Sequence, residues 1–221
     1  MDQELKALKE KLWRNGSPTN IGWDFNGPIL VNDFLVVFLS NYFLRRKYGK
    51  RGISLEEFKC SLSPSYYQFL SSVGAKKPDE EYTESYLRAS KLLYFMPKIA
   101  CGIEEVLKFS KRKGKSNLLI TAHPTMLVEK QTKELGIDQY IDHKFTSIHD
   151  KVEEMPEITK RWMKPENSIY IGDTISDIMA ARKARIPIAV VTYGYQSEEG
   201  LRAHKPDFIV HNACELEKII A

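Results

Sequence analysis

Acidic and hydroxyl side chains directly follow several short apolar segments of the chain. Asp24 follows the first such segment, Thr121 the second and Asp173 the third. Parallel strands of one sheet end at a common edge, where open α/β sheets bind their ligands. Two carboxylates and a hydroxyl at that edge indicate a site for Mg²⁺ or a similar hard cation, which also attracts an anion. A carboxylate beside such a cation is able to act as a nucleophile towards phosphorus.

The same side chains have a simpler explanation, because Asp and Thr often cap the first turn of a helix. For any one of the three residues, the two explanations have equal weight. The cation site is favoured only when the three positions are considered together with the sequence motifs around them.

After Pro97 the chain alternates regularly between helical and extended patterns. Short apolar runs bounded by turn residues predict the strands Asn117–Thr121, Ser168–Gly172, Ile188–Thr192 and Asp207–Val210. The helices predicted around them are Ile103–Arg112, Pro124–Leu135, Val152–Trp162, Ser176–Ala184, Glu198–Ala203 and Cys214–Ile220. Short strands that alternate with helices favour an α/β fold with a parallel sheet covered on both faces.

Two other parts of the chain show helical spacing. Leu5, Leu8 and Leu12 predict a short amphipathic helix over residues 2–13, and the turn-forming residues 15–18 end it. The segment from Asp33 to Tyr94 is rich in Phe, Tyr, Lys, Arg and Ser and has no clear strand pattern. Its apolar residues predict four helices, around Val36–Leu44, Leu55–Cys60, Tyr66–Leu70 and Tyr82–Leu93.

Four motifs, in this order along the chain, resemble those of the haloacid dehalogenase superfamily. They are Asp24-Phe-Asn-Gly-Pro28, Thr121, Lys151 and Gly172-Asp-Thr-Ile-Ser-Asp177. That superfamily has an acid-x-acid-Gly-Thr motif after its first strand, a Ser or Thr after the second, then a Lys and a Gly-Asp-x-x-x-Asp motif. Residues 169–191 look especially similar to the phosphoglycolate-phosphatase-like branch. The resemblance extends from about Ile21 to the C-terminus.

The resemblance implies an α/β fold in which a Rossmann-like parallel sheet core carries a small inserted helical cap. We therefore expect an N-terminal helical extension at 1–19, the core at 20–32 and 95–221, and the cap at 33–94. The resemblance also implies a Mg²⁺-dependent phosphatase that hydrolyses a small phosphorylated metabolite through an aspartyl phosphate on Asp24. A cap of this kind closes over the site, excludes water and selects the substrate.

The resemblance further implies a role for each residue of the site. Asp24 is the expected nucleophile, and it would hold Mg²⁺ together with Asp173 and the main-chain carbonyl of Asn26. Thr121 and Lys151 would bind the phosphoryl oxygens, where positive charge stabilises phosphoryl transfer most.

The resemblance gives Asp177 and the lysines less distinct roles. Asp177 would support either Lys151 or the metal ion without binding the metal directly. Lys151 opens a predicted helix, as the branch requires, but Lys144 and Lys164 are alternatives for the phosphate-binding lysine. Each of these lysines, taken alone, is also typical of a solvated surface.

The chain departs from the superfamily pattern at three places. Asn26 stands at the position of the second acid, Pro28 replaces the usual Thr, and Lys98–Cys101 replaces a usual Pro-Gly. The second acid normally gives a proton to the leaving oxygen and later takes one from the attacking water, and an amide does neither. The backbone carbonyl of Asn26 still suits a metal ion, so we expect metal binding to survive.

Three explanations of Asn26 stay open. The protein is a slow or selective phosphatase whose leaving group needs little help from an acid. Alternatively, it has lost turnover and serves as a binding or regulatory protein on the same fold. In the third explanation Asn26 is an engineered residue or one that deamidates, since Asn-Gly is a flexible pair. Hydrolysis of a phosphomonoester is the first expectation, because dehalogenases and phosphonatases carry other residue types at this position.

A basic run and one histidine leave further alternatives open. Residues 45–51 form the densest basic run, which is a solvated helix end, a clamp for an anionic substrate or a nucleic-acid contact. No recognisable nucleic-acid-binding motif accompanies the run. His123 follows Thr121 and is placed either near a bound phosphate or simply at a helix start.

Composition sets the outer limits of these expectations. The chain has 221 residues, a formal net charge of +4, and 43% hydrophobic and 28% charged residues, which is ordinary for a soluble globular protein. No apolar run approaches the roughly 20 residues that a bilayer-spanning helix needs. The N-terminus lacks a secretory pattern and the three cysteines lie far apart, so we expect the protein to be located in the reducing cytoplasm.

The expected partner is a phosphorylated small molecule, and neither a membrane nor a nucleic acid. We expect the protein to be a monomer or a homodimer.

Overall fold

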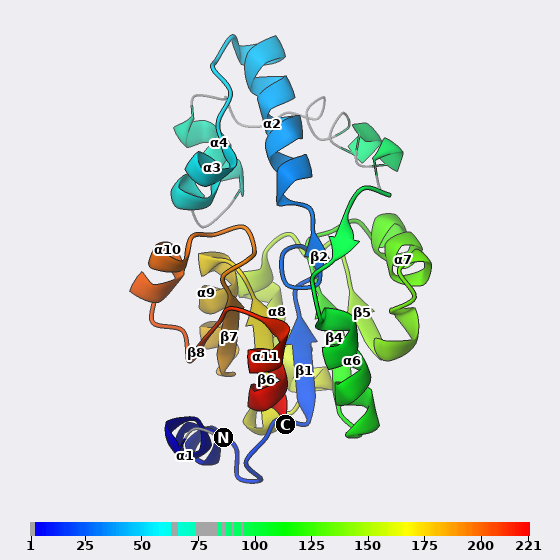
Figure 1. The fold of residues 1–221 in the computed structure, drawn as a ribbon, viewed down its shortest axis with the longest axis vertical. Coiled ribbons are helices and arrows are strands. Elements are labelled where there is room, and N and C mark those ends of the chain that lie inside the picture. Colours follow the sequence, from blue (N-terminus) through cyan, green and yellow to red (C-terminus); the bar gives the residue numbers. More distant parts are fainter. Residues whose placement is uncertain (1–2, 63–65, 74–83, 85–86, 90, 94) are drawn as a thin grey trace.

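A six-stranded parallel sheet is the centre of the computed structural model (Figure 1). Its strands are β1 (Asn20–Trp23), β4 (Ser116–Ile120), β5 (His143–Phe145), β6 (Ser168–Gly172), β7 (Ile188–Val191) and β8 (Phe208–Val210). They lie in the order β5-β4-β1-β6-β7-β8, and each neighbouring pair is parallel. The structure describes residues 3–62, 66–73, 84, 87–89, 91–93 and 95–221.

Helices cover both faces of this sheet, as the alternating pattern predicts. They are α6 (Ile103–Arg112), α7 (Thr125–Glu134), α8 (Lys151–Trp162), α9 (Ile175–Lys183), α10 (Glu198–Ala203) and α11 (Ala213–Ile220). Successive strand residues point to opposite faces. Leu119 and Ile171 therefore pack with α6 and α11, whereas Leu118 and Tyr170 pack with α8 and α9. No helix within the described ranges is long and apolar enough to cross a lipid bilayer.

The helical insert stands beyond the carboxyl edge of the sheet. It contains α2 (Asp33–Tyr48), α3 (Leu55–Ser61) and α4 (Tyr66–Ser72), and the antiparallel strands β2 (Leu30–Val31) and β3 (Lys98–Ile99) connect it to the sheet (Figure 1). Three of the four helices predicted in this segment are thus present. The fourth falls largely outside the described residues, which omit Tyr82 and Tyr86. The exact domain boundaries stay a prediction.

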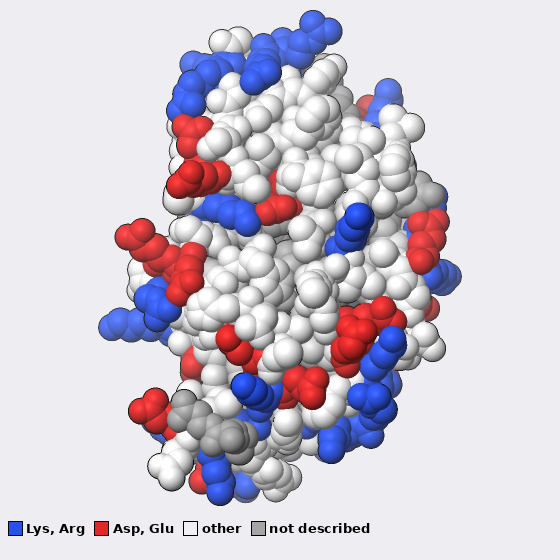
Figure 2. Space-filling view, in the orientation of Figure 1, with Lys and Arg blue, Asp and Glu red and all other residues white. Residues whose placement is uncertain are grey.

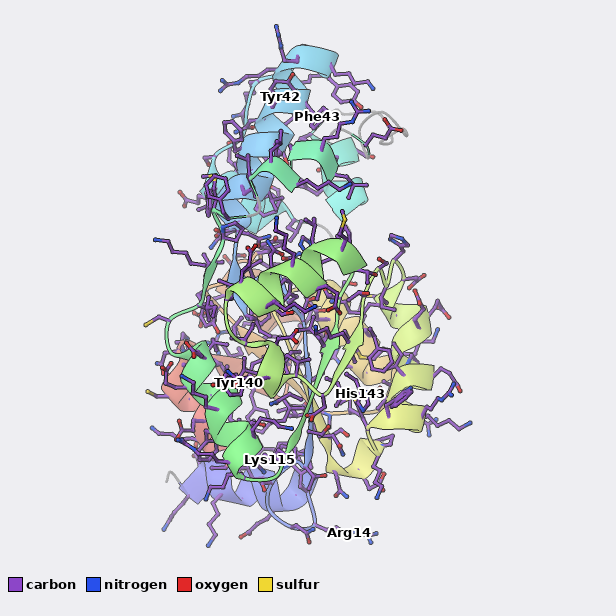
Figure 3. The ribbon with its side chains drawn as sticks, turned by 90° about the vertical axis from the view of Figure 1, so that its right-hand side faces the viewer. Arg14, Tyr42, Phe43, Lys115, Tyr140 and His143 are labelled. Atoms are coloured by element: carbon purple, nitrogen blue, oxygen red, sulfur yellow. The ribbon has the colours of Figure 1, made fainter. Side chains whose placement is uncertain are left out.

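The insert has an apolar core of its own. Val36, Phe58 and Phe69 are among the buried side chains that pack there. Figure 3 shows Tyr42 and Phe43 side by side on α2, where Phe43 is buried in this core and Tyr42 is 53% exposed. The helices of the insert therefore stabilise one another rather than depending only on the sheet beneath.

The basic run lies at the end of α2 that is remote from the sheet. Arg45, Arg46 and Lys47 occupy its last turn, and Gly49 ends the helix in the left-handed conformation. Figure 2 shows basic side chains gathered at the top of the molecule, where Figure 1 places this end of α2. Because a helix of 16 residues is about 24 Å long, the run lies far from the strand ends. Its position agrees with a solvated helix end, where the helix dipole favours cations, and not with a clamp at those strand ends.

Strand β5 is a part of the sheet that the sequence patterns do not reveal. His143–Phe145 contains only one apolar residue and lies at the edge of the sheet, where its residues are half-buried or exposed. Strands β2 and β3, with two residues each, are too short to produce a pattern. Continuous apolar runs reveal buried strands such as β6 and β7 because those strands need apolar side chains on both faces.

The N-terminal helix α1 (Gln3–Leu12) lies against the amino edge of the sheet (Figure 1). Trp13 follows it, and its indole N–H donates to the carbonyl oxygen of Ser168 at 3.0 Å. The Trp13 ring also stacks on Phe208, with 6.0 Å between the ring centroids. The buried ammonium of Lys9 donates to the carbonyl oxygen of Lys218 at 2.9 Å. These contacts join the N-terminal extension to the C-terminal half of the core sequence.

We expect Trp13→Ala to lower the free energy of unfolding by about 3–5 kcal/mol, because it removes a fully buried ring. Trp13→Phe keeps most of the packing but leaves the Ser168 carbonyl without its donor, which costs roughly 1 kcal/mol. Urea denaturation followed by circular dichroism measures both. An Ala variant as stable as the wild type would show that α1 does not depend on this anchor.

Candidate active site

Neighbouring strands deliver Asp24 and Asp173 to the same place. Trp23, the last residue of β1, pairs with Ile171 of β6, and Asp24, which follows β1, donates its N–H to the carbonyl oxygen of Ile171 at 2.8 Å. Asp173 follows Gly172, the last residue of β6. The two carboxylates therefore meet at the carboxyl edge of the sheet, as the strand pattern predicts.

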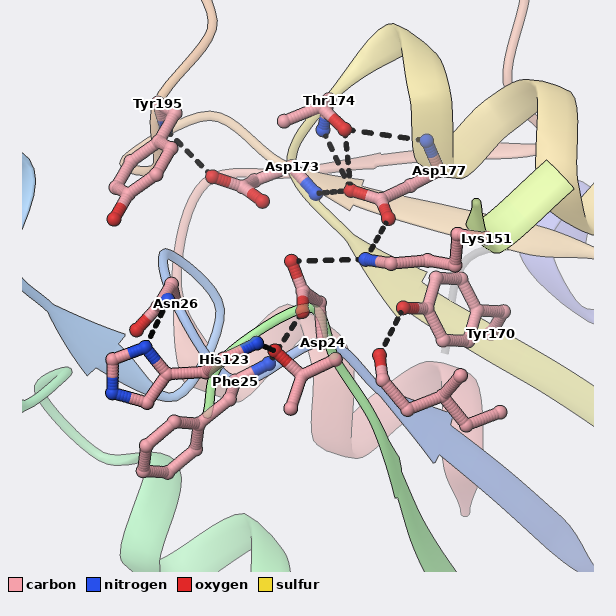
Figure 4. Close-up of polar contacts among 12 residues, drawn as sticks. Asp24, Phe25, Asn26, His123, Lys151, Tyr170, Asp173, Thr174, Asp177 and Tyr195 are labelled. Carbon is pink, nitrogen blue, oxygen red and sulfur yellow. Dashed lines mark hydrogen bonds and ion pairs between the residues drawn. The ribbon is translucent and has the colours of Figure 1, made fainter. Parts of the chain in front are cut away.

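Asp177 completes a buried group of three carboxylates (Figure 4). One oxygen each of Asp24, Asp173 and Asp177 lies within 4.8 Å of the others. Asp177 Oδ2 accepts the backbone N–H groups of Asp173 and Thr174 at 3.1 and 3.0 Å, and Thr174 and Asp177 form the capping box that begins α9. Asp177 Oδ1 accepts from Lys151 at 2.7 Å. Both oxygens of Asp177 are thus engaged by the protein itself.

Lys151 is the cation of this group. It is the first residue of α8, and its Nζ lies 3.2 Å from Asp24 Oδ2 and 5.6 Å from the centre of the Tyr170 ring. Burial by itself would lower the pKa of Lys151, but the charges of Asp177 and Asp24 outweigh burial and hold this pKa well above its ordinary value. Lys151 therefore stays protonated.

The two other lysines considered from the sequence lie elsewhere. Lys144 forms ion pairs with Glu129, at 3.1 Å, and with Asp138. Lys164 precedes a short 3₁₀ turn at Pro165–Asn167, on the far side of β6 from its carboxyl end. Of the three lysines, the structure brings only Lys151 to Asp24.

Asp173 has an oxygen without a partner. Its Oδ2 accepts the N–H of Tyr195 at 2.6 Å, but within the described residues its Oδ1 is a buried side-chain atom with no hydrogen bond. Burial, followed by the charges of Asp177 and Asp24, raises the pKa of Asp173 well above its ordinary value. Burial likewise raises the pKa of Asp24 to about 6. An oxygen-lined, electron-rich site of this kind fits a hard divalent cation such as Mg²⁺.

Two glycines allow the main chain to approach Asp173. A Cβ atom at Gly27 would collide with the Asp173 carboxylate, and so would one at Gly194. Gly27 also has a φ of +98°, which side chains rarely permit. The backbone therefore forms a close wall around the carboxylates.

Asn26 belongs to a hydrogen-bonded chain of polar side chains. Its Nδ2 lies 3.2 Å from His123 Nδ1, and its Oδ1 accepts from Asn32 Nδ2 at 3.1 Å. The chain continues from His123 Nε2 to Gln131 Oε1 at 3.0 Å, and from Asn32 Oδ1 to the hydroxyl of Tyr195 at 2.7 Å. Burial lowers the pKa of His123 to about 4, which keeps the ring neutral. Of these side chains the sequence singles out only His123, and not as a partner of Asn26.

Thr121 lies at the end of β4, the strand beside β1. It is buried, its N–H donates to the carbonyl oxygen of Phe145 at 2.9 Å, and its hydroxyl accepts the N–H of His123 at 3.2 Å. The structure therefore groups Asp24, Lys151, Asp173 and Asp177 by direct contact or proximity. Thr121 stands at the adjacent strand end.

Proteins with similar sequences include phosphatases. Phosphoglycolate phosphatase 1 of Pseudomonas aeruginosa is 24% identical over 147 residues, which are 62% of this chain and 54% of that protein. Pyrophosphatase PpaX of Halalkalibacterium halodurans is 26% identical over 126 residues, which are 54% of this chain and 58% of that protein. The chain thus matches little more than half the length of these curated relatives.

Solved structures match most of this chain in fold. A haloacid dehalogenase-like family hydrolase from Streptococcus pneumoniae superposes with a TM-score of 0.76 at 19% identity, covering 90% of this chain and 96% of that one. A predicted phosphatase from Clostridium acetobutylicum gives 0.77 at 22% identity, with 91% and 97% coverage. These likenesses confirm the α/β core with its helical insert.

The family model agrees with both comparisons. The model of the haloacid dehalogenase-like hydrolases matches residues 21–191, which run from β1 to β7 and include every residue of the acidic group. The chain therefore belongs to the haloacid dehalogenase-like hydrolase family.

Proposed function

We propose that the protein is a Mg²⁺-dependent phosphatase that hydrolyses a small phosphorylated metabolite through an aspartyl phosphate on Asp24. The observation that carries this proposal is an Asp173 oxygen that has no hydrogen-bond partner among the described residues and belongs to one carboxylate group with Asp24, which Lys151 contacts. Relatives named as phosphoglycolate phosphatase and as pyrophosphatase support the reaction class.

The residues of the site divide the work of phosphoryl transfer. Mg²⁺, held by Asp24, Asp173 and the main-chain carbonyl of Asn26, would neutralise charge on the transferred phosphoryl group when bound. Asp24 attacks the phosphorus. Lys151 balances charge on the phosphoryl oxygens, and Thr121 offers its hydroxyl to them.

Asp177 acts on the reaction through Lys151. It accepts the Lys151 ammonium at 2.7 Å while its other oxygen is fixed by the start of α9. The lysine side chain is thereby held in one position, so little conformational entropy is lost when phosphate binds.

A second candidate function follows from Asn26. Its amide is unable to serve as a general acid or base, so the same site would suit a catalytically weak or silent binding or regulatory protein. We also propose a cytoplasmic location, since Cys60, Cys101 and Cys214 are free and exposed, and a monomer or homodimer as the working state.

Replacing the nucleophile tests the first function directly. We expect Asp24→Asn to lower phosphate release from a panel of phosphomonoesters in Mg²⁺ by about 10³-fold or more, because an amide does not attack phosphorus. Asp138→Asn, the same change at an acid paired with Lys144, is the matched control and should keep activity. A fully active Asp24→Asn variant would show that the nucleophile is assigned wrongly.

Replacing Asp173 should increase the stability of the metal-free protein and abolish its stabilisation by Mg²⁺. In EDTA, Asp173→Asn removes a buried charge yet retains an oxygen for the Tyr195 N–H, so we expect stability to increase by about 1 kcal/mol. Thermal unfolding should also show that Mg²⁺ stabilises the wild type but not the variant. An equal response of both proteins to Mg²⁺ would exclude Asp173 as a ligand.

The raised pKa of Asp24 predicts the pH dependence of metal binding. Since this pKa is about 6 in the metal-free fold, against an ordinary 3.8, a proton competes with Mg²⁺ below pH 6. The metal-free fold therefore loses stability as pH rises from 3.8 through 6, and bound Mg²⁺ offsets that loss. Titration calorimetry should show affinity weakening by up to about tenfold per pH unit below 6, with proton release on binding. A constant affinity between pH 5 and 7 would contradict this assignment.

A further inference from the structure

The hydrogen bonds around Asn26 determine which way its amide faces. The hydroxyl of Tyr195 donates to Asn32 Oδ1 at 2.7 Å. Asn32 then presents its Nδ2 to Asn26 Oδ1 at 3.1 Å. The remaining side of the Asn26 amide, its Nδ2, donates to His123 Nδ1 at 3.2 Å. Each group along this path has the donor or acceptor role that its neighbour requires.

The same path fixes the tautomer of His123. Its Nδ1 accepts from Asn26, so the ring proton lies on Nε2 and is donated to Gln131 Oε1 at 3.0 Å. Both side chains are buried, with 6% and 5% exposure. The proton of His123 therefore points away from Asn26 and from the position of the second acid.

Other proton donors near Asp24 are also engaged. The Lys151 ammonium lies between Asp24 and Asp177. The hydroxyl of Tyr170 donates to the carbonyl oxygen of Ile120 at 3.0 Å, and that of Tyr193 to the carbonyl oxygen of Pro28 at 3.2 Å. These hydroxyl and ammonium groups are thus each engaged by an acceptor of the protein, and the amide of Asn26 is itself unable to act as an acid.

We propose that the natural substrates are phosphoryl donors whose leaving group departs as a stable anion, namely acyl phosphates and phosphoric anhydrides. This inference rests on the proposed phosphatase function and narrows its substrate class. A carboxylic acid has a pKa of about 4 and a phosphate a second pKa of about 6, so neither needs a proton to leave at neutral pH. An alkoxide does need one, because its conjugate acid, an alcohol, is about as weak an acid as water.

The reaction balances without an acid from the protein. An oxygen of Asp24 bonds to phosphorus, the bond from phosphorus to the leaving oxygen breaks, and the leaving group takes the electron pair as a carboxylate or phosphate. Water then bonds to phosphorus, the bond to Asp24 breaks, and the proton of the water passes to solvent. The side chain of Asn26 is a fixed amide in both steps and exchanges no proton.

The dependence of rate on the leaving group tests this inference. We would measure kcat/KM in Mg²⁺ for acetyl phosphate, pyrophosphate, a series of aryl phosphates of increasing phenol pKa, and an alkyl phosphate. We expect a steep decline along the aryl series and an alkyl phosphate at least about 10²-fold slower than acetyl phosphate, the contribution that a general acid normally makes. An alkyl phosphate as fast as acetyl phosphate would overturn the inference and leave the phosphatase function standing. No phosphate release from any compound would instead overturn the phosphatase function.

Variants provide a matched comparison. Asn26→Asp restores an acid, so it should raise alkyl phosphate hydrolysis relative to that of acetyl phosphate and flatten the aryl series. Asn41→Asp makes the same change within the insert, where Asn41 pairs with Ile53, and should leave the series unchanged. Nitrogen NMR of the wild-type imidazoles supplies a reading independent of activity. A His123 proton on Nδ1 would overturn the inference, because that proton would point towards Asn26, at the position of the second acid.

Discussion

The site depends on an imbalance of buried charge. Asp24, Asp173 and Asp177 bring three carboxylates into a small volume, and Lys151 is the cation that the described chain places among them. With all four groups ionised the net charge is −2, which a divalent cation would cancel. Unbalanced charge in a protein interior is costly, and the raised pKa values of Asp24 and Asp173 express that cost in the metal-free fold.

The fold maintains this imbalance with rigid elements. Two central strands end at Asp24 and Asp173, and two helices begin at or just before Lys151 and Asp177. Backbone N–H groups at the start of α9 hold one oxygen of Asp177, so that its other oxygen is available to Lys151. The two strands are hydrogen-bonded neighbours, and α8 and α9 pack apolar side chains on the sheet, so moving the carboxylates apart would disrupt these contacts.

Sequence patterns predict the elements of this arrangement better than its contacts. Buried central strands such as β6 carry continuous apolar runs, and motifs place Asp24, Lys151 and Asp173 at their ends or at helix starts, so these parts follow from the sequence. Edge strand β5 has no such run. The partners of Asn26 were also hidden, since His123 lies 97 residues away along the chain and nothing in its local sequence states which nitrogen faces Asn26. The choice of Lys151 over Lys144 likewise needed the geometry, because the sequence alone does not show which of these side chains reaches Asp24.

Asn26 is consistent with its surroundings rather than an isolated loss of an acid. An aspartate at this position accepts hydrogen bonds only, yet the neighbouring His123 Nδ1 is itself an acceptor, so the two would repel unless the imidazole gained or moved a proton. Moving that proton would require Gln131 to present its amide nitrogen in place of its oxygen. The same polar path passes through Asn32, the residue before α2, to Tyr195, whose N–H holds Asp173. A change of residue 26 therefore affects the start of the insert and the carboxylate group together, which links the identity of this one side chain to the geometry of the whole site.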